Sequence, residues 1–197
     1  MAEDSKVSNV GGRYAQALFD LARLEHGSVQ PTLEDFSLTD LIQDVFQKFE
    51  LAAGEKNLQL DAVLPRPSVI VSADLGMIER VLTNLLDNAI RHTPAGGRIT
   101  LALALEGGKV GVTVSDTGPG IPARLLDNLF RRPFSPGTDS RNGGLGLLIV
   151  QRILQLHGSQ IRLLTPDERA TRGGAVFHFE LGGAGAKPNV SGEIRAR

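Results

Sequence analysis

The chain of 197 residues contains no cysteine, which excludes disulfide bonds, thiolate zinc sites and thiol nucleophiles. No apolar run comes near the roughly 18 residues that a membrane-spanning helix needs. The first residues, MAEDSKVSN, lack the basic and then apolar order of a signal peptide. We therefore expect a cytoplasmic domain without membrane contact, although a longer parent protein could be membrane-anchored.

A strong charge of one sign is also missing. The formal net charge is -1, and acidic and basic residues are mixed along the chain without a basic stripe. This argues against a nucleic-acid partner. With 41% hydrophobic residues the chain can build one core. We expect a disordered N-terminus at 1–11, a helical segment and linker at 12–30, one folded domain at 31–183 and a flexible tail at 184–197.

Hydrophobic residues recur at helical spacing in several stretches. Ser37 is a candidate N-cap and Gly54 a candidate stop for one of these helices. The predicted helices cover 12–25, 37–53, 74–92 and 143–157, with a shorter one after Pro122.

Other stretches alternate with the period of two that is typical of strands. Within 98–105 the pattern is strict, and Glu106-Gly107-Gly108-Lys109 predicts a hairpin turn into the next strand. The predicted strands cover 58–64, 69–72, 98–105, 110–116, 160–164 and 175–181.

The predicted helix 74–92 carries an unusual polar face. Asn84, Asn88 and Arg91 stand at positions i, i+4 and i+7, so two carboxamides and a guanidinium share one side, opposite the leucines. A merely solvated face explains the same pattern, although asparagine is a poor residue inside a helix.

Two glycine-rich turns follow. Asp116 ends a predicted strand and is followed by Gly118 and Gly120, which allow a ligand to approach the backbone. Further on, Gly143 opens an apolar helix whose N-terminal amides attract phosphate. The chain has no lysine-bearing P-loop, so phosphates would be held differently from a Walker site.

In order and spacing, NLLDNAIRHTP, DTGPGIP, the segment around Phe130 and Phe134, and GGLGLLIVQRILQLHG resemble the N, G1, F and G2 boxes of sensor histidine kinases. The resemblance covers roughly 21–181. It implies an α+β fold of the Bergerat type, a two-layer α/β sandwich whose mixed sheet is covered by helices on one face.

The resemblance also implies site residues for ATP and Mg²⁺. Asn88 resembles the magnesium ligand, with Asn84 supporting the metal or the phosphates. Asp116 resembles the carboxylate that accepts the adenine amino group, which predicts ATP over GTP. Arg91 resembles a basic residue near the phosphates. The complete predicted set is Asn84, Asn88, Arg91, Asp116, Gly118, Gly120, Ile121, Gly143, Gly144, Leu145, Gly146 and Leu147.

The predicted activity is transfer of the γ-phosphate of ATP to a histidine, with a response regulator downstream. In the family's ATP hydrolases a glutamate stands one turn before the metal asparagine, where this chain has Asn84. No base aimed at water is visible, which favours transfer to a protein side chain.

We expect no phosphoacceptor within the chain, because none of its four histidines stands in the family's phosphoacceptor context. We expect the histidine-bearing dimerisation hairpin to be missing, apart from a remnant near 15–25. The chain would then be a fragment, and a monomer or weak homodimer.

Two alternatives stay open. The F segment departs from the family pattern, because Phe130 and Phe134 are four residues apart and enclose Arg131 and Arg132. This keeps open a degenerate nucleotide-binding regulatory module. A serine kinase of the anti-sigma type is the other alternative.

Overall fold

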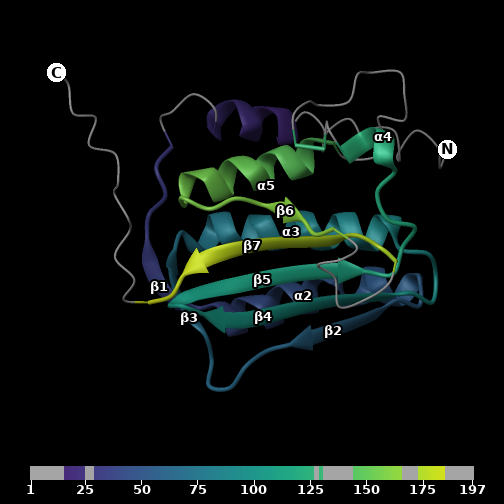
Figure 1. Cartoon of the computed structure of the whole chain (residues 1–197), viewed down its shortest axis with the longest axis horizontal. Coiled ribbons are helices and arrows are strands. Elements are labelled where there is room, and N and C mark those ends of the chain that lie inside the picture. The colour runs from purple at the N-terminus through teal and green to yellow at the C-terminus, as the bar shows by residue number, and fades with distance from the viewer. Residues whose placement is uncertain (1–15, 25–28, 127–128, 131–143, 166–172, 185–197) are drawn as a thin grey trace.

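The computed structural model describes residues 16–24, 29–126, 129–130, 144–165 and 173–184. One layer is a five-stranded sheet in the order β2-β4-β5-β7-β6 (Figure 1). Its strands are β2 (Gln59–Val63), β4 (Arg98–Glu106), β5 (Lys109–Asp116), β6 (Arg162–Leu163) and β7 (Val176–Gly182). β2 runs parallel to β4, whereas all other neighbours are antiparallel. The predicted mixed sheet is therefore confirmed.

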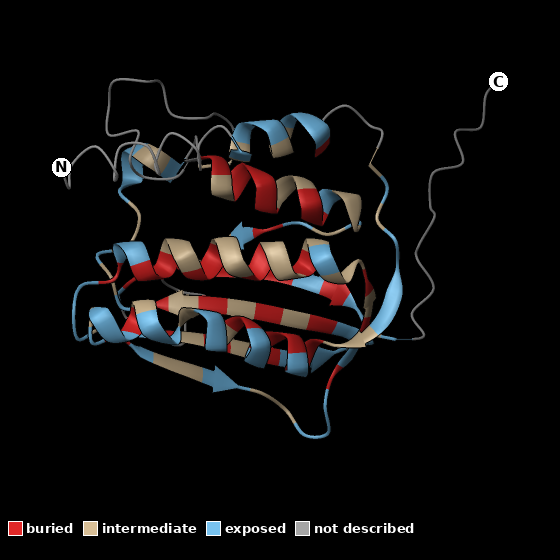
Figure 2. Ribbon diagram, turned by 180° about the vertical axis from the view of Figure 1, so that it is seen from behind, coloured by how far each residue is buried: buried red, intermediate tan, exposed pale blue. Residues whose placement is uncertain are grey.

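The second layer consists of the helices α2 (Leu38–Glu55), α3 (Leu75–His92) and α5 (Gly144–Leu156), which lie on one face of the sheet (Figures 1 and 2). Strand side chains alternate between buried and partly exposed, as strand geometry requires. Ile99, Leu101 and Leu103 of β4 lie in the core, with the alternating valines of β5. A short α4 (Ala123–Leu126) follows the glycine-rich turn after Asp116.

A separate two-stranded sheet was not predicted. β1 (Glu34–Ser37) pairs antiparallel with β3 (Ile70–Ala73), and a bridge between Val71 and Gly183 joins it to the end of β7. β1 is only four residues long and has no apolar alternation, so the sequence pattern did not reveal it.

The predicted end of α2 at Gly54 is wrong. The helix passes through Gly54, and Asn57 takes the left-handed conformation with a φ of 52°. Leu58 N–H donates to the carbonyl of Ala53 at 2.9 Å, and Asn57 N–H donates to that of Gly54 at 3.0 Å. This is a Schellman motif with asparagine in the usual glycine position. The predicted N-cap is confirmed, because Ser37 Oγ accepts the N–H of Asp40.

Helix α3 is anchored at its beginning by two neighbours. Asp74 is its N-cap and accepts the N–H of Met77 and, with its other carboxylate oxygen, that of Thr32. The backbone N–H of Asp74 donates to Nε2 of His157 at 3.0 Å. Leu75 stands in the first turn of α3 and is only half-buried. The apolar side chains further along the helix are buried: Ile78, Leu82, Leu85, Leu86 and Ala89.

The segment 16–24 is helical and lies beside α5, at the edge of the helical layer (Figures 1 and 2). Its Leu24 is buried in the common core. Among the described residues, no helix has the length and apolar character needed to cross a membrane.

Candidate nucleotide-binding site

Asn84 and Asn88 lie on α3, the helix that packs against α5. Both are half-buried. Asn84 Nδ2 donates to the carbonyl of Arg80 at 2.8 Å. Its Oδ1 faces α5 and lies 3.1 Å from the point that a Cβ would occupy at Gly146. Asn88 stands one turn later, and its carboxamide has no hydrogen-bond partner within the part of the chain that the structure describes.

Arg91 forms an ion pair with Asp87 on the same helix. Both side chains are partly open to solvent, with side-chain exposures of 34% and 46%. Such an exposed i, i+4 pair contributes little to stability, so the guanidinium can exchange partners readily. The structure thus places Arg91 beside the asparagine face without fixing it there.

Asp116 ends β5 as a buried carboxylate, with 8% of its surface exposed. Its Oδ1 accepts the N–H of Gly118 at 2.8 Å, and its backbone N–H donates to the carbonyl of Ala175 at 3.0 Å. The hydrogen bond from Gly118 orients the carboxylate. An ionised carboxylate can accept several hydrogen bonds at once.

Gly174 is a part of this site that the sequence analysis missed. A Cβ at Gly174 would lie 1.6 Å from the backbone oxygen of Asp116, so only glycine fits. Gly174 N–H donates to the carbonyl of Gly118, and its own carbonyl lies 3.0 Å from a Cβ built at Gly120. The pair Gly173-Gly174 directly before β7 was the available signal.

The G2 segment contributes the beginning of α5. Gly144 is its first residue, whereas Gly143 lies outside the described residues. The side chains of Leu145 and Leu147 are buried, with 3% and 7% exposed. Their proposed contribution to a site is therefore limited to the backbone. Ile121, which follows the turn at Gly120, is half-buried and packs on the core.

Positive charge gathers at the C-terminal end of α3. Lys56 Nζ donates to the carbonyls of Ile90 and Thr93, at 2.6 and 2.8 Å. The pKa of His92 is lowered from 6.5, chiefly by reduced hydration of the ring and then by the charge of Arg91, and nearby Asp116 partly opposes this.

Residues 73–184 match the sequence model of a protein family, the histidine kinase-, DNA gyrase B- and HSP90-like ATPases. That span covers more than half of the chain and contains all four predicted boxes. The chain belongs to this family. The α+β fold expected for a histidine kinase ATP-binding domain is confirmed as well.

Individual relatives narrow the family to sensor histidine kinases. The adaptive-response sensory kinase SasA of Synechocystis sp. is 38% identical over 148 residues, which are 74% of this chain and 38% of SasA. The chain thus spans well under half of that relative. The catalytic domain of histidine kinase ThkA matches with a TM-score of 0.68 and 32% identity, over 77% of this chain and 95% of that domain.

A second ThkA structure holds this kinase in complex with the response regulator protein TrrA. It matches with a TM-score of 0.73 and 29% identity, over 89% of this chain and 49% of that chain. The chain is therefore a sensor histidine kinase ATP-binding domain, and ATP is the nucleotide of its family.

Only part of the F box can be assessed. Phe130 packs edge-on against Phe177 of β7, with ring centroids 6.4 Å apart. Phe134, Arg131, Arg132, Arg141 and His26 lie outside the described residues. The other histidines have structural partners or neighbours: His157 contacts Asp74, and Nδ1 of His178 lies 3.1 Å from Oγ1 of Thr113.

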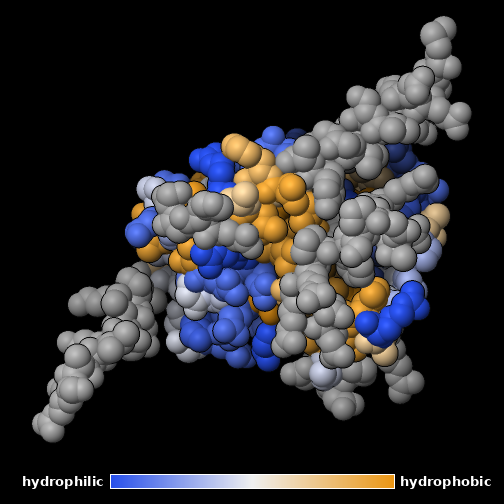
Figure 3. All heavy atoms as spheres, turned by 90° about the horizontal axis from the view of Figure 1, so that it is seen from above, coloured by the Kyte–Doolittle hydropathy of each residue, from blue (hydrophilic) through white to orange (hydrophobic). Residues whose placement is uncertain are grey.

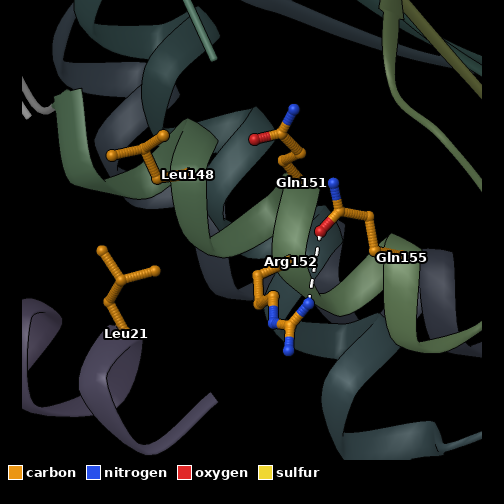
Figure 4. Close-up of a pocket in the computed structure, with 5 residues that line it drawn as sticks. All are labelled: Leu21, Leu148, Gln151, Arg152 and Gln155. Atoms are coloured by element: carbon orange, nitrogen blue, oxygen red, sulfur yellow. Dashed lines mark hydrogen bonds between the residues drawn. The ribbon is translucent and has the colours of Figure 1, made fainter. Parts of the chain in front are cut away.

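A hollow of about 320 Å³ lies between the segment 16–24 and α5, lined by Leu21, Leu148, Gln151, Arg152 and Gln155 (Figure 4). It contains none of the candidate nucleotide residues. Apolar side chains gather on this side of the molecule (Figure 3), and Leu18 and Phe19 of the segment are 47% and 60% exposed.

Proposed function

We propose that this domain binds Mg-ATP and passes the γ-phosphate to a histidine on a dimerisation hairpin, with a response regulator as the next acceptor. The observation that carries the proposal is the buried Asp116 at the end of β5, enclosed by Gly118 and Gly174. A carboxylate accepts a hydrogen bond from the adenine amino group, whereas the carbonyl of guanine at that position would be repelled.

The asparagines fit a magnesium ion. Mg²⁺ prefers oxygen ligands and keeps several waters and phosphate oxygens around it. Asn88 supports this role, because its carboxamide has no competing hydrogen bond to another described residue. Asn84 has committed its Nδ2 to Arg80 and has Oδ1 left to face the beginning of α5. When bound, the ion would neutralise phosphate charge.

The amides at the beginning of α5 support the phosphate end of the site. A helix N-terminus carries unsatisfied N–H groups and a partial positive charge, and Gly144 and Gly146 keep it free of large side chains. The guanidinium of Arg91 adds a positive charge, and it can exchange its ion pair with Asp87 for one with a phosphate. These residues bind and orient the nucleotide, while the reacting imidazole comes from the hairpin.

A phosphotransfer assay tests this proposal. The chain would be incubated with γ-labelled ATP, Mg²⁺ and a separately purified dimerisation hairpin from a sensor kinase such as SasA. We expect label on the hairpin that is lost in acid and kept in alkali, as for phosphohistidine, and no label with Asn88→Ala. Acid-stable label would indicate a serine kinase. The chain could instead bind ATP and label neither this hairpin nor the histidine-bearing hairpin of another kinase. That result would indicate a regulatory module.

A further inference from the structure

Lys56 joins the ends of two helices. It is the C-cap of α2, and its carbonyl accepts the N–H of Gly96 at 3.1 Å. Its Nζ donates to three carbonyls at the end of α3, those of Ile90 at 2.6 Å, Thr93 at 2.8 Å and Arg91 at 3.3 Å. We call residues 90–93 the exit of α3. Lys56 thus contacts this exit through its side chain, and the turn that follows it through its backbone.

This contact is strong for physical reasons. The last carbonyls of a helix have no partner within the helix and carry partial negative charge. An ammonium group supplies three donors and a full positive charge. Lys56 is half-buried and Thr93 is buried, so water competes poorly for these bonds. The Schellman turn at Asn57 fixes the backbone from which the lysine reaches out.

The exit of α3 is packed tightly against the turn that follows Asp116. A Cβ built at Gly97 would lie 2.4 Å from the methyl group of Thr93 and 2.9 Å from Oγ1 of Thr117. A Cβ at Gly118 would lie 2.9 Å from the carbonyl oxygen of His92. The end of α3 and the turn 117–118 therefore lie in close contact, with glycines at the points of nearest approach.

We propose that Lys56 is a positioning residue for adenine recognition. By fixing the exit of α3, it sets the place of the turn that donates the Gly118 N–H to Asp116, and so the orientation of the carboxylate. The inference rests on the nucleotide site proposed above. Lys56 touches neither Asp116 nor the asparagines in any hydrogen bond to the described residues, so it acts through the α3 exit.

A matched control is available on the same helix. Lys48 also joins α2 to α3, through an ion pair with Glu79, but it lies near neither the exit of α3 nor the glycine turn. Lys48→Met and Lys56→Met therefore remove the same side-chain charge from the same helix. Only the second change releases the carbonyls at the end of α3.

The experiment measures dissociation constants of ATP and ADP by calorimetry for the full chain. We expect Lys56→Met to weaken both nucleotides by about tenfold, the equivalent of one lost charge-assisted hydrogen bond. The two losses should be equal, because both nucleotides carry adenine. Lys56→Arg should restore most of the affinity, and Lys48→Met should bind like the wild type. If Lys56→Met fails to fold, Lys56→Gln, with a single amide donor group, should give a smaller loss of the same kind.

A double variant separates positioning from general stability. If Lys56 acts through Asp116, then Lys56→Met combined with Asp116→Asn should bind no more weakly than Asp116→Asn alone. Fully additive losses, a loss confined to ATP, or a Lys56→Met variant that is less stable but binds normally would each overturn the inference. Absence of binding by the wild type would instead overturn the proposed function itself.

Discussion

The side-chain oxygen of Asn84 on α3 lies 3.1 Å from the position of a Cβ at Gly146 on α5. The helix with the asparagine face and the helix proposed to bind phosphate at its N-terminus therefore meet at a glycine. A side chain at Gly146 has to displace the carboxamide, because that distance is shorter than an ordinary carbon–oxygen contact.

Gly146→Ala tests this contact. We expect ATP affinity to fall by about tenfold, because the displaced Asn84 no longer matches the metal and phosphates. Calorimetric titration of both proteins measures the change. An alanine variant that binds ATP as tightly as the wild type would show that the close contact has no role in the site.

The end of α2 gives a prediction about stability alone. Gly54 is helical and a Cβ there meets nothing within 4 Å, so Gly54→Ala should raise the free energy of unfolding by about 0.5–1 kcal/mol. Asn57→Val should lower it by about 1–2 kcal/mol, because a β-branched residue does not tolerate the left-handed conformation. Urea denaturation measures both changes, and a stabilised Asn57→Val would contradict the Schellman assignment.

His92 predicts a pH dependence. In the folded protein the pKa of His92 is lowered from its usual value of 6.5. As the pH falls through 6.5, the unfolded chain therefore takes up a proton at His92 before the folded chain does. The contribution of His92 to stability is therefore complete above pH 6.5 and decreases as the pH falls toward the folded-state pKa. His92→Gln should reduce the slope of unfolding free energy against pH in this window. An unchanged slope would exclude His92 as its source.

The segment 16–24 is held to α3 by the ion pair between Asp20 and Arg80, whose side chains are 14% and 35% exposed. Arg152 Nε adds a hydrogen bond to the carbonyl of Leu24 at 3.1 Å. Asp20→Asn should weaken docking of the segment by about 1–2 kcal/mol, since it leaves a partly buried guanidinium without its counter-charge. Amide hydrogen exchange within 16–24 measures the effect.

The exposed pair Lys109–Glu180 provides the comparison. Glu180→Gln should leave exchange in the segment 16–24 unchanged, because the pair is distant and solvent-screened. Equal exchange in Asp20→Asn and the wild type would mean that the ion pair does not hold the segment, and that the packing of Leu24 and its hydrogen bond from Arg152 do.

The sequence was most informative where a feature is local. The 3.6-residue period predicted α3 nearly to its ends, and strict alternation predicted β4 and β5. Side-chain spacing also predicted that Asn84 and Asn88 share one face of α3, and the structure shows both to be half-buried. A helix face consists of residues three and four positions apart, so a short stretch of sequence is enough to predict it.

Features that depend on distant segments were missed. Glycine is required at position 174 because the end of β5 places the backbone oxygen of Asp116 against it. The two residues are 58 positions apart, so no local sequence pattern predicts this contact. No sequence pattern singled out Lys56, because its three acceptors lie 34 to 37 residues further on. At the end of α2, Gly54 was the expected stop, but the chain used Asn57, which also tolerates a positive φ.

The most direct test of the proposed site is a calorimetric titration of the wild type and of Asp116→Asn with Mg-ATP and with Mg-GTP. We predict that the wild type binds ATP and not GTP, and that Asp116→Asn loses most of its ATP affinity while remaining folded. Equal binding of both nucleotides by the wild type, or ATP binding that Asp116→Asn leaves intact, would contradict the assignment of Asp116 to the adenine.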